Sequence, residues 1–243
     1  MELENIIYPG FNKTLSELKA ISKVKKKSCE IVDLTEIEWV RDVLRHRIEE
    51  IGSYDIKFRK PTEVEIQFVS KIVGADIDMD GLKNNFHKSK RIIGITSGKG
   101  GVGKSTITSL LGIAFDELGK KVGIMDSDIW GYSVPKILGA KFPPIPFNER
   151  IFPSRINNLN VISMDYFVKQ DEAVIWRGPM LHKAIEQFLF EVLWHDIDIL
   201  LIDMPPGTGD VSISLSQFLK YFENIVVTLS LIHISEPTRL STI

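Results

Sequence analysis

The chain has 243 residues, of which 44% are hydrophobic and 26% charged, with a formal net charge of −2 at pH 7. This length suits one large or two modest domains, and the near-neutral charge excludes an electrostatic argument for binding nucleic acid or an anionic membrane surface. The one cysteine, Cys29, excludes an intramolecular disulfide and agrees with a reducing compartment. No secretory signal opens the sequence, and no apolar run approaches the roughly 20 residues that span a bilayer. We therefore expect a cytoplasmic protein that binds neither nucleic acid nor membrane.

Residues 1–87 are predicted to form a small α+β domain. The alternating stretches 29–34 and 54–58 are typical of half-buried strands. Between them, the capping-box pattern from Thr35 to Glu38 predicts the start of a helix. The spacing of apolar residues predicts its inner face, which comprises Ile37, Val40, Leu44, Ile48 and Ile51.

A second capping box, from Thr62 to Glu65, predicts another helix, which Gly74 ends. The apolar residues on one side of this helix are Val64, Phe68 and Ile72. From residue 88 onward the pattern alternates strand and helix, which is typical of βαβ units and a parallel sheet. The predicted fold is therefore α/β: a mostly parallel, Rossmann-like P-loop sheet with flanking helices, preceded by the small α+β domain.

The stretch from Gly98 to Thr106 matches the phosphate-binding pattern G-x-x-x-x-G-K-S/T. An apolar run at 91–96 predicts a buried strand before it. A helix is predicted after it, with an apolar face made of Ile107, Leu110, Leu111, Ala114 and Leu118. A strand, a glycine-rich loop and a helix in this order favour a P-loop over a glycine-rich turn without a ligand.

The residue types of this loop suit phosphate binding. Glycines let backbone N–H groups close around phosphate oxygens, and the helix N-terminus adds unpaired donors and a partial positive charge. Lys104 is expected to lie along the β- and γ-phosphates, and the Ser105 hydroxyl to ligate Mg²⁺. The candidate nucleotide-binding residues are Gly98, Lys99, Gly100, Gly101, Val102, Gly103, Lys104, Ser105, Thr106 and Gly207.

Carboxylates follow two of the predicted strands. The strand at 122–125 leads into Asp126 and Asp128, and the apolar strand 199–203 ends in Asp203, as in a Walker B motif. Parallel α/β sheets bind ligands at the carboxyl edge, where these residues emerge. The loop from Pro205 to Asp210 lies where a switch that senses the γ-phosphate is expected.

The remaining elements continue the α/β pattern. Further strands are predicted at 159–163 and 225–228, and a short helix at 212–221. A longer helix, after Pro179, has an apolar face made of Leu181, Ala184, Ile185, Phe188, Leu189 and Val192.

Four separated motifs resemble the Mrp (ApbC-like) family of iron–sulfur cluster carrier ATPases, within the deviant-Walker-A group of P-loop proteins. The resemblance covers residues 91–228. The motifs are Gly98 to Ser105, Asp126 to Gly131, Trp176 to Pro179 and Asp203 to Asp210.

This resemblance implies an ATP-hydrolysing enzyme that uses Mg²⁺ and works as a nucleotide-sandwich homodimer. It implies that Lys99 reaches the partner's phosphates and acts with Lys104 and Asp128 as the catalytic group. Asp128 is expected to position the attacking water, and Ser105, Asp126 and Asp203 to support Mg²⁺. The division of roles between Asp126 and Asp128 stays open.

The sequence departs from the family after Thr228, where the family continues with Thr-Pro-Gln, further βα units and a cluster-ligating Cys-x-x-Cys pair. Residues 229–243 resemble translated adapter read-through, so we expect a non-native tail and an incomplete ATPase domain over 88–228. Because Cys29 is its one cysteine, the chain does not itself supply the cluster ligands of the family.

Three functions follow as hypotheses. The first is an ATP-dependent iron–sulfur cluster carrier that delivers clusters to apo-proteins. The second is a positioning ATPase of the partitioning type, which shares Lys99 and both aspartate motifs. The third is a non-catalytic nucleotide-binding fragment. A small-molecule kinase is disfavoured because no acceptor or lid segment is evident and Lys99 has no role in one.

Overall fold

A computed structural model of the chain describes residues 2–25, 28–78, 83, 86, 90–129, 131–167, 178–194, 197–207, 209–219 and 221–229. The chain divides into two compact units. The first, here called the N-terminal unit, comprises Met1–Asn85, Lys141–Arg155 and Gln187–His195. The second, the nucleotide unit, comprises Phe86–Ala140, Ile156–Glu186 and Asp196–Ile243. Two segments from later in the chain thus join the first 85 residues.

The largest sheet has six strands, and its order differs from the order along the chain. From one edge to the other the strands are β10 (Ser154–Ile156), β11 (Leu159–Ser163), β7 (Val122–Asp126), β12 (Ile199–Asp203), β6 (Arg91–Thr96) and β13 (Glu223–Val226). The pairings from β11 to β13 are all parallel. This arrangement confirms the predicted α/β fold. It places β12 between β6 and β7, so the three strands that lead into the predicted site are neighbours.

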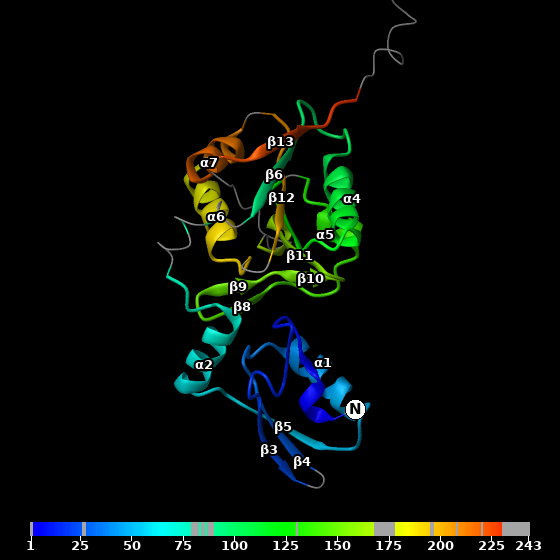
Figure 1. Cartoon of the computed structure of the whole chain (residues 1–243), viewed down its shortest axis with the longest axis vertical. Coiled ribbons are helices and arrows are strands. Elements are labelled where there is room, and N and C mark those ends of the chain that lie inside the picture. Colours follow the sequence, from blue (N-terminus) through cyan, green and yellow to red (C-terminus); the bar gives the residue numbers. More distant parts are fainter. Residues whose placement is uncertain are drawn as a thin grey trace, which may run out of the picture. The chain divides into compact units, whose positions relative to one another are not determined.

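Helices cover both faces of this sheet (Figure 1). One face carries α4 (Lys104–Glu117) and α5 (Val134–Leu138), and the other carries α6 (Gly178–Phe190) and α7 (Asp210–Phe218). The predicted apolar face of α6 is buried, from Leu181 to Leu189. Trp176 and Arg177 of the predicted motif, Thr208, and tail residues 230–243 lie outside the described residues.

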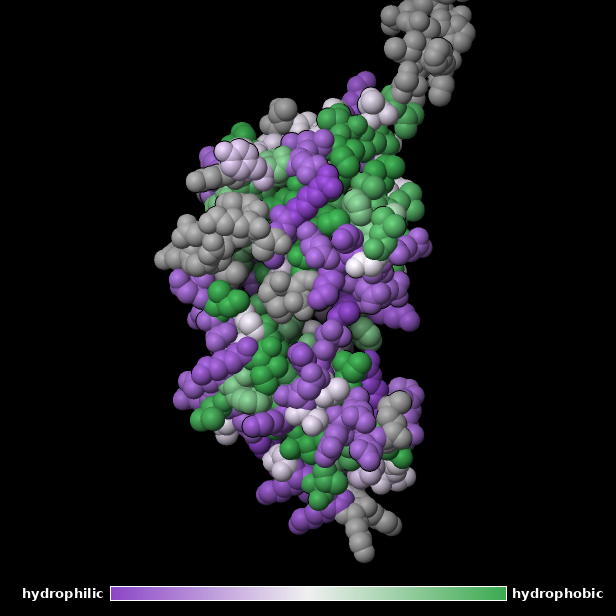
Figure 2. Space-filling model, viewed as in Figure 1, coloured by the Kyte–Doolittle hydropathy of each residue, from purple (hydrophilic) through white to green (hydrophobic). Residues whose placement is uncertain are grey.

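The predicted apolar face of α4 is wrong except at Leu111, which is half-buried against the core. Leu110 is 56% exposed and Leu118 is 74% exposed, whereas the buried face consists of the small residues Thr108, Ser109 and Gly112. A Cβ added to Gly112 would lie 2.6 Å from a side-chain carbon of Ile124 on β7. At Gly112 the helix therefore lies too close to β7 for a side chain, whereas Leu111 and Phe115 of the same helix pack against the core of the sheet. Figure 2 shows apolar surface over α4 and β13.

The N-terminal unit is built around a three-stranded sheet. Its strands are β3 (Ile21–Lys25), β4 (Ser28–Val32) and β5 (Asp55–Arg59), with β4 antiparallel to β3 and parallel to β5. The other elements are the 3-10 helix η1 (Leu3–Asn5), the strand pair β1 (Ile7–Tyr8) and β2 (Lys13–Thr14), the hairpin β8 (Ile145–Phe147) and β9 (Arg150–Phe152), α1 (Glu38–Glu49) and α2 (Glu63–Val73). Aromatic and aliphatic side chains from these elements form one core.

The two predicted capping boxes have different outcomes. At α2 the box is confirmed, because Thr62 and Glu65 each accept the other's backbone N–H, at 3.3 and 2.8 Å. At α1 it is wrong, since the N-cap is Ile37 and no side chain caps it. The Asp33 carboxylate instead accepts the N–H of Glu36 at 3.0 Å, which holds the chain in a turn before the helix.

The inner face of α2 also differs from the prediction. Val64 is 75% exposed, and the buried residues are Val69, Ser70 and Val73. Phe68 and Ile72 of the predicted face are half-buried against the core. In α1 the predicted face is confirmed, with Val40, Leu44 and Ile48 buried. None of the helices in the described ranges has the length and apolar character needed to cross a bilayer.

Candidate functional site

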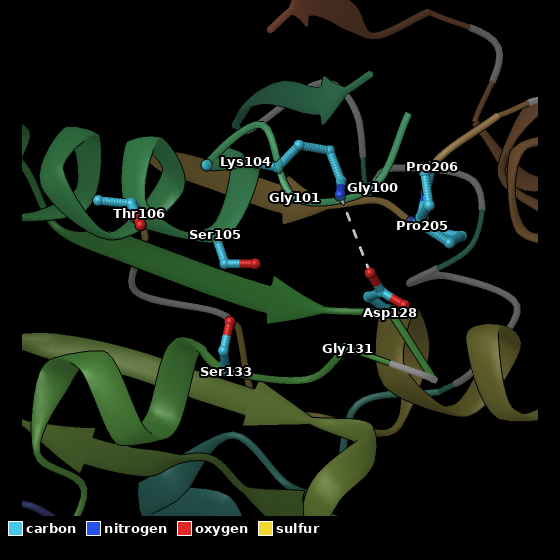
Figure 3. A pocket seen from close by; sticks show the side chains of 11 residues that line it. Gly100, Gly101, Lys104, Ser105, Thr106, Asp128, Gly131, Ser133, Pro205 and Pro206 are labelled. Carbon is cyan, nitrogen blue, oxygen red and sulfur yellow. Dashed lines mark ion pairs between the residues drawn. The ribbon is translucent and has the colours of Figure 1, made fainter. Parts of the chain in front are cut away.

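A cavity of about 520 Å³ opens at the carboxyl edge of the large sheet, where β6, β7 and β12 end (Figure 3). Three loops form its walls: the glycine-rich loop after β6, the loop after β7 and the loop after β12. Its lining residues are Gly100, Gly101, Gly103, Lys104, Ser105, Thr106, Asp128, Gly131, Ser133, Pro205 and Pro206. The sheet order thus brings together three segments that are about 30 to 100 residues apart in the chain.

The loop after β6 has the backbone conformation that its glycines predict. Gly101 and Gly103 have φ angles of +75° and +90°, in the left-handed region that side chains other than glycine rarely adopt. The helix α4 begins directly afterwards at Lys104, so its first turn faces the cavity with unpaired N–H groups. Among the predicted residues, Gly98, Lys99, Val102 and Gly207 do not line the cavity.

Lys104 and Asp128 form an ion pair across the cavity. The two side chains are almost fully buried, and Lys104 Nζ lies 3.9 Å from Asp128 Oδ2 (Figure 3). Gly131 makes room for this carboxylate, because a Cβ there would lie 2.9 Å from Asp128 Oδ2. The pair therefore places one cation and one anion where an incoming phosphate would meet both.

Asp203 holds the first turn of α4 against the end of β12. Its carboxylate accepts hydrogen bonds from the Ser105 hydroxyl at 2.5 Å and from the Thr108 hydroxyl at 3.2 Å. Burial raises the pKa of Asp203 to about 6, and the Ser105 hydrogen bond and the Lys104 charge oppose that rise. Sequence reasoning paired Ser105 with Asp203 as candidate Mg²⁺ ligands but missed Thr108, which follows Ser105 by about one helical turn.

Asp126 lies beside Asp203 in the sheet, since the two residues are register partners on β7 and β12. Asp126 is fully buried, and that burial together with the Asp203 charge raises its pKa to about 7. Its Oδ2 accepts from Ser133 N at 3.1 Å, Val134 N at 3.2 Å and Ser163 Oγ at 3.2 Å, and its Oδ1 from Asp128 N at 3.3 Å. All four donors are groups of the protein, and Asp126 is not among the residues that line the cavity.

The donor set at this edge fits Mg²⁺ in the way expected of a nucleotide site. Within the described ranges, no group of three or more His, Cys, Asp or Glu side chains is arranged to hold a metal ion alone. Mg²⁺ is commonly bound through one or two carboxylates, with phosphate oxygens and water completing its shell. The Ser105 hydroxyl and the Asp203 carboxylate supply such oxygens next to a cavity large enough for a polyphosphate.

Ser97 connects the loop after β6 to the loop after β12. Its backbone oxygen accepts the N–H of Gly207 at 2.8 Å, and its hydroxyl donates to the backbone oxygen of Lys99 at 2.7 Å. Gly207 has a φ of +86°, which explains the need for glycine there. Lys99 itself is exposed. Gly207 therefore contacts the P-loop through the backbone, although it was predicted as a direct nucleotide-binding residue.

Several residues of the site were not singled out from the sequence. Ser133 lines the cavity, and Ser163 and Ser127 hold the ends of β7 and β12, with Ser127 Oγ donating to Asp203 O at 2.7 Å. A single serine, whether in a loop as Ser127 and Ser133 are or at a strand end as Ser163 is, carries no periodic or spacing signal. Gly131 was detectable, because it closes the motif that begins at Asp126.

A family model described as ParA: NUBPL iron-transfer P-loop NTPase matches residues 88–234 of the chain. The iron-sulfur cluster carrier protein of Helicobacter pylori is 34% identical over 233 residues, which are 93% of this chain and 62% of that protein. The iron-sulfur cluster carrier protein of Mycobacterium leprae is 46% identical over 138 residues, which are 57% of this chain and 36% of that protein. The chain thus spans less than two thirds of the length of these curated relatives.

A solved structure has the same fold. It is a nucleotide-binding protein from Archaeoglobus fulgidus in complex with ADP, and it aligns with a TM-score of 0.52 at 34% identity. The alignment covers 63% of this chain and 59% of that chain. The likeness agrees with the α/β fold described above.

Proposed function

Because this chain belongs to the NUBPL iron-transfer P-loop NTPase family, we propose that it binds and hydrolyses ATP with Mg²⁺, as the nucleotide-dependent part of an iron–sulfur cluster carrier. The carrier works as a homodimer and delivers clusters to apo-proteins. The observation that carries this proposal is the convergence of Lys104, Asp128, Ser105 and Asp203 around one cavity beside the P-loop.

Each of these groups has a task in binding the polyphosphate. The backbone N–H groups around Gly101 and Gly103 donate hydrogen bonds to the phosphate oxygens, and Lys104 neutralises the negative charge of the phosphates. Ser105 and Asp203 hold Mg²⁺, which when bound supplies Lewis-acid stabilisation of the charge on the phosphates. The ion pair between Lys104 and Asp128 gives way when the phosphates take Lys104 as their partner.

The Asp128 carboxylate then orients the attacking water. The water oxygen forms a bond to the γ-phosphorus and a water proton passes to an oxygen of the transferred group, which leaves as inorganic phosphate. The bond from that phosphorus to the β–γ bridging oxygen breaks, and ADP leaves with the bridging oxygen and its electron pair. Lys99, which is exposed at the mouth of the loop, serves the second subunit by neutralising charge that develops on the transferred group.

The cluster is cargo in this proposal. The one cysteine, Cys29, is buried in the core of the N-terminal unit. We therefore assign the nucleotide chemistry, and no cluster ligand, to the residues of this chain. The names of the curated relatives support the cargo, and the motif set supports it over the partitioning-type alternative.

The test of the nucleotide chemistry compares ATP turnover by the wild type, Lys104→Ala and Lys120→Ala. Lys104→Ala is expected to lower turnover at least about 100-fold, because the phosphate charge loses its buried cation. Lys120→Ala removes an exposed lysine beyond α4 and is the matched control, expected to match the wild type. Unchanged turnover in Lys104→Ala contradicts the P-loop assignment, and wild-type binding without turnover favours the non-catalytic fragment.

Lys99→Ala tests the homodimer. Groups that act in trans on phosphoryl transfer contribute roughly 10³–10⁵ in rate, so turnover should collapse while nucleotide affinity stays near that of the wild type. Turnover per chain should also rise with protein concentration. A loss of nucleotide binding in Lys99→Ala would show instead that this lysine acts within its own subunit.

Cluster delivery is tested by anaerobic transfer from the reconstituted full-length gene product to an apo-protein, and absence of transfer rejects it.

A further inference from the structure

The loop between β7 and α5 forms the wall of the cavity that faces the P-loop (Figure 3). Three of its residues, Asp128, Gly131 and Ser133, line the cavity. The Ser133 side chain points from this wall toward the side on which Ser105 lies. Within the described part of the chain, the Ser133 hydroxyl makes no hydrogen bond, so its donor and acceptors are available to a ligand.

Asp126 accounts for the position of this wall. Its Oδ2 accepts the N–H groups of Ser133 and Val134, and its Oδ1 accepts the N–H of Asp128. The hydroxyl of Ser163 adds a fourth hydrogen bond from the neighbouring strand β11. The Asp126 carboxylate thus forms hydrogen bonds at both ends of the loop, and both of its oxygens accept from groups of the protein itself.

We infer that Ser133 is a further nucleotide-site residue, whose hydroxyl donates a hydrogen bond to a phosphate oxygen of the bound nucleoside triphosphate, and that Asp126 is the positioning residue that holds it there. The inference rests on the proposed function and deepens it. It assigns Asp126, predicted from the sequence as a support for Mg²⁺, an action through the loop that carries Asp128 and Ser133.

The chemistry favours this assignment. The Ser105 hydroxyl donates to Asp203 at 2.5 Å, whereas the Ser133 hydroxyl has no such partner among the described residues. Ser133 faces the same space from the other side. A hydroxyl next to a polyphosphate forms a charge-assisted hydrogen bond, which is about twice as strong as a bond between neutral groups. A serine at this position therefore adds affinity that alanine does not supply.

The test measures equilibrium binding of a fluorescent, non-hydrolysable ATP analogue with Mg²⁺ by the wild type, Ser133→Ala and Ser133→Thr. Ser133→Ala is expected to weaken binding about tenfold. Ser133→Thr keeps the hydroxyl and should stay within about threefold of the wild type. Ser216→Ala, which removes an exposed hydroxyl on α7, is the matched control and should bind as the wild type does.

The positioning role of Asp126 is tested by a double-mutant cycle with the same binding assay. If Asp126 acts through Ser133, the Ser133→Ala change should cost less than about twofold when Asp126→Asn is already present. Additive losses overturn the positioning role. If Asp126→Asn does not fold, the comparison of Ser133→Ala with Ser133→Thr still decides the assignment of Ser133.

The outcomes separate this inference from the proposed function. If the wild type binds no nucleotide, the proposed function fails. If the wild type binds, Lys104→Ala does not, and Ser133→Ala binds as tightly as the wild type, the inference is overturned and the proposed function stands. Equal weakening in Ser133→Ala and Ser133→Thr also overturns it, because the loss then follows from the loop and not from the hydroxyl.

Discussion

The two units of the molecule both bury aspartates but surround them differently. In the N-terminal unit, Asp33 is buried beside the guanidinium of Arg41, whose Nε lies 2.5 Å from its Oδ2. In the nucleotide unit, Asp126 and Asp203 are buried next to each other on adjacent strands, and burial raises both of their pKa values. Buried carboxylates are stabilised by a cation and destabilised by a second carboxylate.

This difference distinguishes a carboxylate that is paired with a cation from the carboxylates of the candidate site. The ion pair between Arg41 and Asp33 ties α1 to the turn that follows β4. The pair in the nucleotide unit instead retains unfavourable electrostatic energy that a bound cation can relieve, and such perturbed groups cluster at functional sites. The same unit contains the cavity and the glycine-rich loop. The raised pKa values and the position of the cavity therefore both indicate a functional site at the carboxyl edge of the large sheet.

The largest expected effect is a pH dependence of stability confined to the nucleotide unit. Asp126 has a pKa of about 7 in the folded chain against an ordinary value of 3.8. The folded state therefore binds more protons than the unfolded state, and in metal-free buffer the free energy of unfolding falls as pH rises from about 4 to about 7. At roughly 1.4 kcal/mol per pKa unit, Asp126 alone accounts for up to about 4 kcal/mol.

Amide hydrogen exchange of β12 and β4 between pH 5 and pH 8, in the presence of EDTA, measures this effect in each unit separately. Protection of β12 should fall with rising pH, and protection of β4 should change little. Adding Mg²⁺ and nucleotide at pH 8 should restore the protection of β12. Protection of β12 that rises with pH would contradict the raised pKa values of Asp126 and Asp203.

A smaller effect is expected when the Asp33 carboxylate is removed. Asp33→Ala deletes the partner of Arg41 and the acceptor of the Glu36 N–H, and it should lower the free energy of unfolding of the N-terminal unit by about 2–3 kcal/mol. Urea unfolding followed by exchange of β4 measures the change. The matched control is Asp42→Ala, which breaks the exposed pair with Arg45 and should leave stability unchanged. Equal effects of the two variants would refute the structural role of Asp33.

The smallest expected effect sharpens the role of Asp126. Ser163→Ala removes a hydroxyl that lies 3.2 Å from Asp126 Oδ2. In the wild type, the hydrogen bond from this hydroxyl lowers the pKa of Asp126 and so opposes the rise caused by burial. The variant should cost about 1 kcal/mol more at pH 8, where Asp126 is ionised, than at pH 5, where it is protonated, because hydrogen bonds to charged groups are stronger.

Urea unfolding at the two pH values measures this difference. Ser154→Ala is the matched control, since that buried hydroxyl donates to the backbone oxygen of Phe142 and its contribution should not depend on pH. A loss of equal size at both pH values in Ser163→Ala would show that Asp126 does not ionise in this range.

The glycine-rich loop and the strands around it were predictable because their signals are local. Gly101 and Gly103 adopt the left-handed conformation that the pattern requires, and the strand that ends at Asp203 is apolar throughout. The inner face of α6 was predictable too, since Leu181, Ile185 and Leu189 recur at helical spacing and all three are buried. The face of α4 was not, because apolar side chains such as Leu110 and Leu118 lie opposite a strip of small residues, and spacing alone favours the larger ones.

The sequence by itself determined the P-loop, the fold class and the carboxylates that follow β7 and β12, because each depends on contiguous residues and on the backbone preferences of glycine. Only the tertiary structure decided that Asp126 and Asp203 are register partners, that Asp126 holds the Ser133 loop, and that residues 141–155 and 187–195 join the N-terminal unit. These features arise from pairings between segments far apart in the chain. Such pairings depend on sheet order and close packing, which no local pattern of residues encodes.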